Sequence, residues 1–233
     1  EDATIDYQFV VDKDRNEFTE QALARISQLY LEKKDYKTSL PYLIRLETEA
    51  DFPQNIIFAQ SNAMKASYEL EKYHEAVIFA DKVLQNEKIE NSVKSDAQII
   101  IARSAMKTGD ENKAKDAYAE VLKIATGKLA AEALYYDAYF KNKSEQFKAS
   151  NESIQLLAKE YAGYKYFGAK GLVLMANNFY KLNDAFQATY ILESVIKNFE
   201  DYPDIIEEAT SELAIIKSEQ AKTNDSINIE EKN

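Results

Sequence analysis

The chain has 233 residues, of which 45% are hydrophobic, so it is long enough to bury a large core or to form an extended array. Its net charge of −11 argues against nucleic acid as a partner, because duplex-binding domains carry a basic excess. Only five Gly and three Pro are present, which disfavours β-sandwiches and Gly-rich phosphate loops and favours helices joined by short connections.

Further classes of protein are excluded by what the sequence lacks. It contains no Cys, which removes disulfides and thiol chemistry. No apolar run approaches the ~20 residues that a membrane-spanning helix needs, so we expect no direct membrane span. The first residue is Glu1 rather than Met and no signal peptide is visible, which leads us to expect a processed chain or a fragment.

The first predicted helix covers Ala3–Val11, with Ile5 and Phe9 on one side. It has no partner helix before it in the sequence. Residues 1–16 are therefore predicted to be the end of a preceding helix or an N-terminal cap.

A helical hairpin is predicted between residues 17 and 49. Leu23, Ile26 and Leu29 recur at helical spacing, a polar turn follows at 33–36, and a second amphipathic stretch follows the turn. Pro41 fits near the start of that second helix, where its missing N–H costs nothing.

The same plan recurs four more times. The later turns fall at 71–73, 108–110, 142–146 and 183–184, between predicted helices at 57–70 and 74–85, 95–107 and 112–124, 129–140 and 147–160, and 166–182 and 185–198. A last helix runs from Asp204 to about Lys217. We predict an array over residues 17–217 and a polar tail over 218–233, disordered from Thr223 onwards.

A small residue recurs early in the second helix of every hairpin, at spacings of 37, 38, 36 and 38: Ser39, Ala76, Ala114, Ser150 and Ala188. The matching position of the first helix is also small in four hairpins out of five: Ser27, Met64, Ala102, Ala138 and Ala176. Small residues on both helices let the two axes approach closely. This periodicity indicates an array of helical hairpins.

These hairpins resemble tetratricopeptide repeats (TPRs) over roughly residues 17–220. The matching motifs are Tyr30-x5-Tyr36-x2-Ser39, Tyr73-x2-Ala76 and Gly109-Asp110-x3-Ala114-x3-Tyr118. The resemblance implies an all-α, right-handed superhelical solenoid of about five hairpins with a C-terminal capping helix. The chain departs from the family in its repeat length, which exceeds the usual ~34 residues, and at Lys141, where an aromatic residue is expected.

In that family the first helices line a concave groove, which implies a non-enzymatic scaffold that binds a peptide or helix of a partner protein. The groove residues carried over are Arg25, Gln28, Asn62, Lys65, Tyr68, Arg103, Lys107, Tyr135, Tyr139, Asn177, Tyr180 and Lys181. Amides and Tyr hydroxyls can hydrogen-bond a peptide backbone, and Lys and Arg can meet acidic groups. The alternative is that the Tyr residues only fill the core and the Lys residues are only solvated.

Two other functions stay open. The chain could be a structural segment of a longer array that positions other domains or subunits in an envelope assembly. It could also self-associate through its end helices, because the last helix carries more apolar residues than one buried face requires.

We expect no enzyme, metal or cofactor. His74 is the only histidine and lies at a turn, and neither a second His nor a Cys is present to complete a metal site or a triad. The best acidic pairs, Glu207-Glu208 and Glu230-Glu231, are sequence neighbours, which point apart on a helix.

Two further features bear on location and binding. The repeat spacing and the aromatic-Pro pairs Phe52-Pro53 and Tyr202-Pro203 resemble bacterial, Bacteroidetes-type cell-envelope TPR proteins. That resemblance implies a periplasmic or outer-membrane-associated protein, with the cytoplasm as the alternative. The aromatic linker Tyr161–Gly168 is expected either to pack over the fourth hairpin or to bind a ligand.

Overall fold

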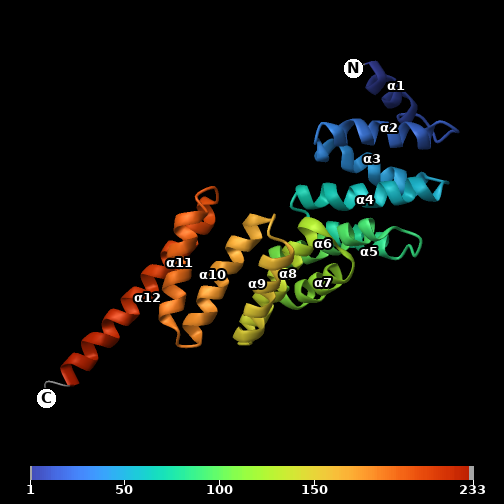
Figure 1. Cartoon of the computed structure of the whole chain (residues 1–233). Helices are drawn as coiled ribbons and strands as arrows, with labels where there is room; N and C mark the ends of the chain where they lie inside the picture. Colours follow the sequence, from blue (N-terminus) through green and yellow to red (C-terminus); the bar gives the residue numbers. More distant parts are fainter. Residues whose placement is uncertain (1, 231–233) are drawn as a thin grey trace. The chain divides into compact units, whose positions relative to one another are not determined.

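The computed structural model describes residues 2–230, with side chains over 3–222 (Figure 1). The described residues form twelve α-helices and no strand. The helices are α1 (Asp2–Val11), α2 (Thr19–Glu32), α3 (Tyr36–Glu49), α4 (Pro53–Glu69), α5 (Tyr73–Leu84), α6 (Asn91–Thr108), α7 (Glu111–Ile124), α8 (Gly127–Lys143), α9 (Phe147–Glu160), α10 (Lys165–Lys181), α11 (Ala185–Asn198) and α12 (Pro203–Glu230).

The helices belong to two compact units. Unit 1, Glu1–Ala125, contains α1 to α7, and unit 2, Thr126–Asn233, contains α8 to α12. In each unit every helix packs on the next one along the chain, and the first helices of neighbouring hairpins also touch. Thus α4 contacts α2 and α6 in unit 1, and α10 contacts α8 and α12 in unit 2. We call the surface formed by these first helices the first-helix face of each unit.

The small residues lie where the two helices of a hairpin cross, as the sequence predicts. All five second-helix residues, from Ser39 to Ala188, have no exposed surface. In two hairpins the crossing is also hydrogen-bonded. The Ser39 hydroxyl donates to the Ser27 carbonyl at 3.1 Å, and the Ser150 hydroxyl donates to the Ala138 carbonyl at 2.8 Å. The close approach of the two helices therefore lets their axes pack tightly. It also gives each buried serine hydroxyl a hydrogen-bond acceptor.

One left-handed residue turns the chain in every hairpin, five positions before the small residue. These residues are Lys34, Glu71, Gly109, Glu145 and Asn183, with φ between 56° and 80°. Only one of the five is glycine, the residue that adopts this conformation without steric cost. The sequence places the turns correctly, and the structure adds the backbone conformation that they share.

Aspartates begin the second helix of three hairpins. The carboxylates of Asp35, Asp110 and Asp184 accept the backbone N–H groups of Thr38, Lys113 and Gln187 at 3.1, 3.1 and 3.0 Å. Each bond satisfies an N–H that has no partner within the helix. The turns are therefore fixed locally, one hairpin at a time.

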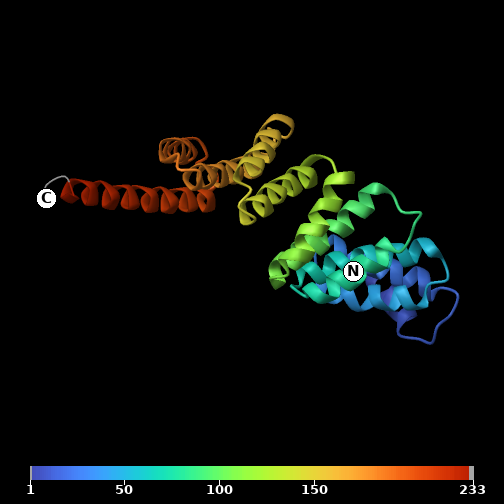
Figure 2. The same cartoon turned by 90° about the horizontal axis from the view of Figure 1, so that it is seen from below.

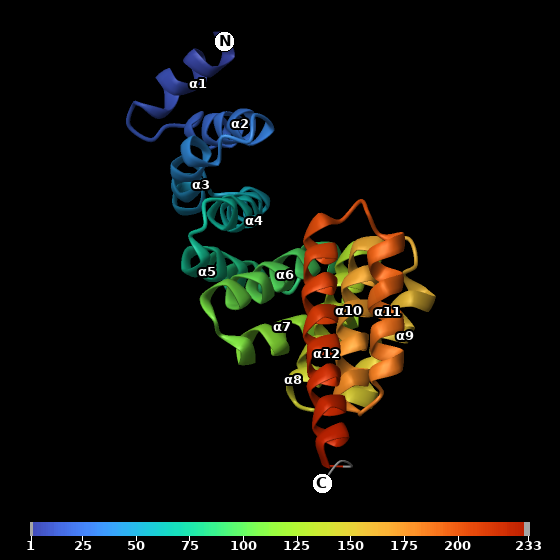
Figure 3. The same cartoon turned by 90° about the vertical axis from the view of Figure 1, so that its left-hand side faces the viewer.

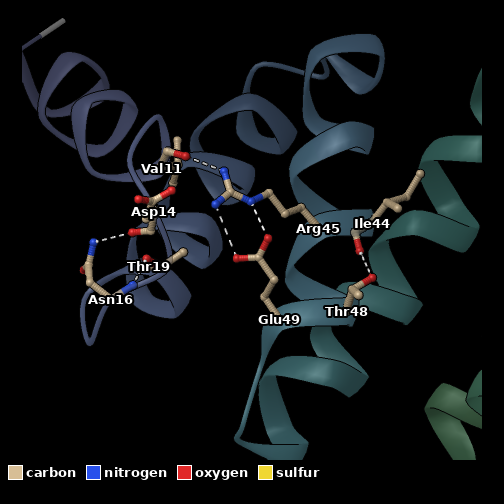
Figure 4. Close-up of polar contacts among 8 residues, drawn as sticks. All are labelled: Val11, Asp14, Asn16, Thr19, Ile44, Arg45, Thr48 and Glu49. Atoms are coloured by element: carbon tan, nitrogen blue, oxygen red, sulfur yellow. Dashed lines mark hydrogen bonds and ion pairs between the residues drawn. The ribbon is translucent and has the colours of Figure 1, made fainter.

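The first helix, α1, is tied to α3 by Arg45 (Figure 4) and by Tyr42, whose hydroxyl donates to the Gln8 side chain of α1. The Arg45 guanidinium donates to the Val11 carbonyl at the end of α1, and it makes an ion pair with Glu49 at 2.6 Å. The Val11 side chain is buried beside Leu46 and Ala59. The helix expected at Ala3–Val11 is therefore present and packs on the first hairpin.

The structure corrects two expectations about α3 and α8. Pro41 is the sixth residue of α3 and not part of its first turn. Because Pro has no N–H, the Lys37 carbonyl lacks its usual intrahelical donor. Pro41 is exposed, so water can reach that carbonyl. Lys141, which stands where an aromatic residue is expected, instead donates to Asp137 at 2.7 Å and to Ser153 at 2.8 Å. A polar contact thus replaces an apolar one between α8 and α9.

The last helix is longer than expected. Figures 2 and 3 show α12 as one unbroken helix that lies beside α10 and α11 and continues past them. It ends at Glu230 rather than near Lys217, so the tail predicted to be disordered is helical over 223–230; residues 231–233 lie outside the described part. The reason is local, because 218–230 contains no Gly or Pro to stop a helix.

Candidate partner-binding surfaces

A hollow of about 530 Å³ lies between the first helices α2 and α4 of unit 1. It is lined by Glu17, Glu20, Gln21, Ala24, Arg25, Gln28, Phe52, Asn55 and Phe58. Phe52 is 58% exposed, so a flat apolar ring borders the hollow. Arg25 and Gln28, which the sequence placed in a groove, are brought together here, with amides and two aromatic rings around them.

Arg25 is the one basic side chain among the residues that line this hollow, where the carboxylates of Glu17 and Glu20 also lie. Its side chain is exposed, and within the described residues it makes no ion pair or side-chain hydrogen bond. Gln28 donates to Glu32 at 3.1 Å along the same helix. A guanidinium without a partner, beside amides and rings, can hold a carboxylate with two parallel hydrogen bonds.

Glu20 fixes one wall of the hollow. Its carboxylate accepts the backbone N–H groups of Asp51 and Phe52 at 3.1 and 3.2 Å and the Asn55 amide at 2.7 Å. Partial burial alone would raise the pKa of Glu20, but these hydrogen bonds outweigh it and lower that pKa. Glu20 thereby joins α2 to the start of α4 and holds Phe52 at the rim.

The other predicted groove residues of unit 1 are mostly engaged. Lys65 on α4 pairs with Asp96 on α6 at 2.6 Å. The Asn62 amide donates to the Phe58 carbonyl one turn earlier in α4, and Tyr68 packs edge-on against Tyr73 of the next helix. Two further members lie on α6, where Arg103 is half-buried and Lys107 is exposed.

Aromatic rings form a chain on the first-helix face of unit 2. Consecutive ring centroids lie 5.1–6.3 Å apart along Tyr202, Tyr166, Phe167, Tyr135, Tyr136 and Tyr139. Tyr135 is only 7% exposed, so this ring belongs to the core, as the alternative reading of the sequence has it. Tyr139 is half-buried at the other end. The ring pair that joins α8 to α10 is Tyr135 with Phe167, which is tilted with an interplanar angle of 36°, and such a contact stabilises the packing of the two helices.

A cation and several carboxylates surround these rings. The Lys170 ammonium lies 5.2 Å from the Tyr135 ring centroid and 5.8 Å from that of Tyr166. The Tyr166 hydroxyl donates to Asp204 of α12 at 3.0 Å. Burial, together with that hydrogen bond and the charge of Asp204, raises the pKa of Tyr166 to about 12, and burial likewise raises the pKa of Tyr135.

The pKa of Glu208 on α12 is also raised. Partial burial is the largest cause, and repulsion from Glu212 and Asp204 adds to it, while Lys170 acts in the opposite direction. The site is therefore rich in negative charge around a single ammonium.

The remaining predicted residues of unit 2 lie near the opposite end of α10. Asn177 accepts from the Asn142 amide of α8 at 3.2 Å, the Tyr180 hydroxyl donates to Glu219 of α12, and Lys181 is exposed. Next to them Asn178, fully buried, accepts from Asn142 at 2.7 Å and donates to Asn151 at 2.7 Å. This amide network joins α8, α9 and α10, and the sequence analysis missed it.

The aromatic linker packs over the fourth hairpin and also borders a second hollow. A β-carbon added to Gly127 at the start of α8 would lie 2.9 Å from the Tyr164 hydroxyl, so the two are in close contact. Tyr161 lines a hollow of about 380 Å³ between α9, α10 and α11, with Leu157, Leu172 and Phe199. The packing expectation is thus met at Tyr164, ligand binding stays a prediction, and the second half of the expected linker, from Lys165, belongs to α10.

His74 is exposed at the start of α5. Over the described part of the chain, no three metal-binding side chains come together. None of the helices described in the structure has the length and apolar character required to cross a bilayer.

The role of the predicted groove residues stays a prediction, and the sequence does not indicate which side chains pair with one another. Arg25, Gln28, Tyr135 and Tyr139 were identified by their helical register. The acidic residues of α12 that face Lys170 were missed as members of this surface. Their spacing of four, from Asp204 to Glu208 to Glu212, is the one signal that could have placed them on a common face.

Solved structures show which class of fold this is, although no protein-family model and no curated protein matches the sequence. A tetratricopeptide repeat protein from Parabacteroides merdae ATCC 43184 is 15% identical, with a TM-score of 0.67 over 90% of this chain and 77% of that one. Together with the hairpin geometry, this likeness shows that the chain has the tetratricopeptide-repeat fold.

Two more structures agree. YrrB, described as a TPR protein with an unusual peptide-binding site, is 13% identical with a TM-score of 0.63, over 86% of this chain and 96% of YrrB. MamA is 11% identical with a TM-score of 0.62, over 81% of this chain and 96% of MamA. At these identities the likeness extends to the fold alone.

Proposed function

We propose that this protein is a non-enzymatic interaction scaffold that holds an extended peptide or a helix of a partner protein on its first-helix face. The observation that carries the proposal is the hollow between α2 and α4, where Arg25 is the one basic side chain of the lining and makes no ion pair within the described residues. The unusual peptide-binding site described for YrrB, which has the same fold, is consistent with this proposal.

Each part of the hollow has a role in holding a peptide. Arg25 pairs with an acidic side chain or a terminal carboxylate. Gln21 and Gln28 offer amides to the peptide backbone, and Phe52 and Phe58 contact a neighbouring apolar side chain. Glu20 keeps Phe52 in place through three hydrogen bonds, so the site is formed before the partner arrives.

The test is a crosslinking pull-down from native lysate with wild type, Arg25→Glu and the control Lys37→Glu. Lys37 is exposed on the second helix of the same hairpin, so the control makes the same charge reversal away from the hollow. We expect Arg25→Glu to lose a protein that wild type and Lys37→Glu both retain. Equal recovery by all three baits would overturn the hollow as the binding site.

Arg25 is a sharper probe than the basic residues further along the face. Reversing Lys65 would also break its ion pair with Asp96, so lost binding could reflect a disturbed contact between α4 and α6. Arg25 has no such partner in the described structure.

A second function, as a structural segment that extends or joins other parts of an assembly, is favoured by exposed apolar side chains on α1 and α12. Ile5 and Phe9 are 66% and 63% exposed, and Ile215 is 51% exposed. Such faces also suit self-association through the end helices. Light scattering over a hundredfold concentration range tests self-association, and a constant monomer mass would exclude it.

We also propose, from the envelope-type repeat spacing alone, that the scaffold acts in the periplasm or at the periplasmic face of an outer membrane. Fractionation of native cells with an antibody to the chain tests this location. Recovery only in the cytoplasmic fraction would overturn it.

A further inference from the structure

The rings and charges around Lys170 have the composition of a cation-binding cage. The walls are the faces of Tyr135 and Tyr166, from α8 and α10, and the rim is formed by Asp204 and Glu208 of α12. The faces of Tyr rings attract ammonium and guanidinium groups because their π-systems carry negative potential. The Lys170 ammonium already lies over both rings, so the structure contains one cation held in this way.

The single positive charge of Lys170 balances only part of the negative charge around these rings. Within the described residues, no carboxylate makes an ion pair with it, and its ammonium instead lies over the two rings. Three carboxylates, Asp204, Glu208 and Glu212, lie at intervals of four along α12 and repel one another. Two of them face Tyr166 and Lys170, so one ammonium is matched against an excess of negative charge. A second cation would relieve that repulsion.

The geometry also allows a cation from a partner protein to replace the Lys170 ammonium. Lys170 is half-buried and Glu208 exposed, so solvent reaches both the ammonium and the acidic rim. A lysine side chain has four rotatable carbons and can swing aside without moving α10. Tyr135 is buried beneath it at 7% exposure, so removal of Lys170 would uncover the ring face.

We propose that Tyr135, Tyr166, Asp204 and Glu208 form a subsite for a cationic side chain of a partner protein, an arginine or lysine, and that Lys170 occupies this subsite in the free protein. An arginine suits it better than a lysine, because its planar guanidinium stacks on a ring while its N–H groups reach a carboxylate. This inference rests on the proposed scaffold function, because it states which chemical group of the partner protein would bind at unit 2. It differs from the hollow at Arg25, which takes an anionic group.

The experiment measures, by anisotropy, binding of the peptide (Arg-Gly)3-amide, labelled with fluorescein on its N-terminal amine, to four full-length chains. They are wild type, Lys170→Met, Lys170→Met/Glu208→Gln and Lys170→Met/Glu207→Gln. Met preserves the length and apolar stem of Lys170 but removes the competing ammonium. Glu207 is the adjacent carboxylate on α12, exposed and outside the cage, so it controls for the overall charge of the helix.

We expect Lys170→Met to bind the arginine peptide about fivefold more tightly than wild type, and Glu208→Gln to reverse that gain. Glu207→Gln should leave the gain intact, and (Glu-Gly)3-amide with the same N-terminal fluorescein should not bind. Equal affinities for wild type and Lys170→Met would overturn the proposal. So would an equal loss from Glu207→Gln and Glu208→Gln, because bulk attraction to an acidic chain would then explain the binding. Circular dichroism confirms that each chain is folded.

The two proposals fail separately. If Arg25→Glu abolishes partner capture while the arginine peptide ignores Lys170 and Glu208, the scaffold function stands and the cage is wrong. If the peptide follows the cage variants while capture ignores Arg25, the cage stands and the hollow of unit 1 is wrong.

Discussion

The two units use one backbone plan to present different chemistries. In unit 1 the first-helix face has an unpaired arginine among amides and two Phe rings. In unit 2 the same face has a chain of rings bordered by the carboxylates of α12. What the units share is confined to the turn, the small residue at the crossing and the buried second-helix positions. The repeat therefore constrains how helices cross and leaves the exposed first-helix positions free to differ.

The largest expected effect tests the shared plan. Ala114→Leu in unit 1 and Ala188→Leu in unit 2 each place a large side chain at a crossing with no exposed surface. We expect each to lower the free energy of unfolding by about 1–3 kcal/mol through overpacking. Urea denaturation measures the loss, and hydrogen exchange should centre it on the hairpin that carries the change. Lys115→Leu, exposed on α7, is the matched control, and a comparable loss there would contradict the explanation.

The second effect concerns a feature that unit 1 has alone, the arginine that holds α1. Arg45→Met removes the bond to the Val11 carbonyl and the ion pair with Glu49. Both side chains are partly exposed, so after allowance for solvent screening we expect α1 to lose about 1–2 kcal/mol of protection. Hydrogen exchange of residues 3–11 measures it. Arg25→Met should leave the hydrogen exchange of α1 unchanged. Faster exchange of α1 in both variants would mean that the loss of positive charge, and not the loss of the Arg45 bonds, is the cause.

The third effect is an increase in stability that we expect in both units. Replacing a left-handed non-glycine residue by Gly removes backbone strain, so Lys34→Gly and Glu145→Gly should each raise stability by about 0.5–1 kcal/mol. Lys33, one residue earlier with φ of −81°, provides the control, because Gly there only adds flexibility to the unfolded chain. Thermal denaturation ranks the variants, and a gain from Lys33→Gly would contradict the assignment.

The smallest effect sharpens the charge difference between the units. The pKa of Glu208 is raised by burial, Glu212 and Asp204, with Lys170 opposing and Tyr135 close by. An acid with a raised pKa binds its proton more tightly in the folded state, so stability is lost as pH rises from the ordinary glutamate pKa through the raised one. Glu208→Gln should therefore raise the melting temperature slightly at pH 7 and lose this advantage at low pH. The same gain from Glu207→Gln would show that total charge, not this site, is responsible.

The hairpins could be predicted from the sequence because their determinants are local. Helical periodicity, a polar turn and a small residue five positions after the left-handed residue all lie within one repeat. The crossing residues from Ser39 to Ala188 were consequently placed correctly and are buried.

The chemistry of the first-helix faces could be predicted only in part. The ion pair of Lys65 with Asp96 and the approach of Tyr166 to Asp204 join residues 31 and 38 positions apart. Such contacts depend on how far each hairpin is shifted and rotated against the next, which no single repeat encodes. The end of α12 differs from the prediction for the opposite reason: the polar composition of 218–230 predicts a disordered tail, whereas helix propensity is local and no Gly or Pro in this stretch interrupts the helix.

The recurrence of a left-handed residue at one fixed position has a consequence for engineering and for descent. A segment running from one such residue to the next, for example from Glu71 to Gly109, begins and ends with the same backbone geometry. Copying or deleting that segment would return the chain to the correct register at the following crossing. The array can thus change its length by whole cassettes while the exposed faces of the helices diversify independently.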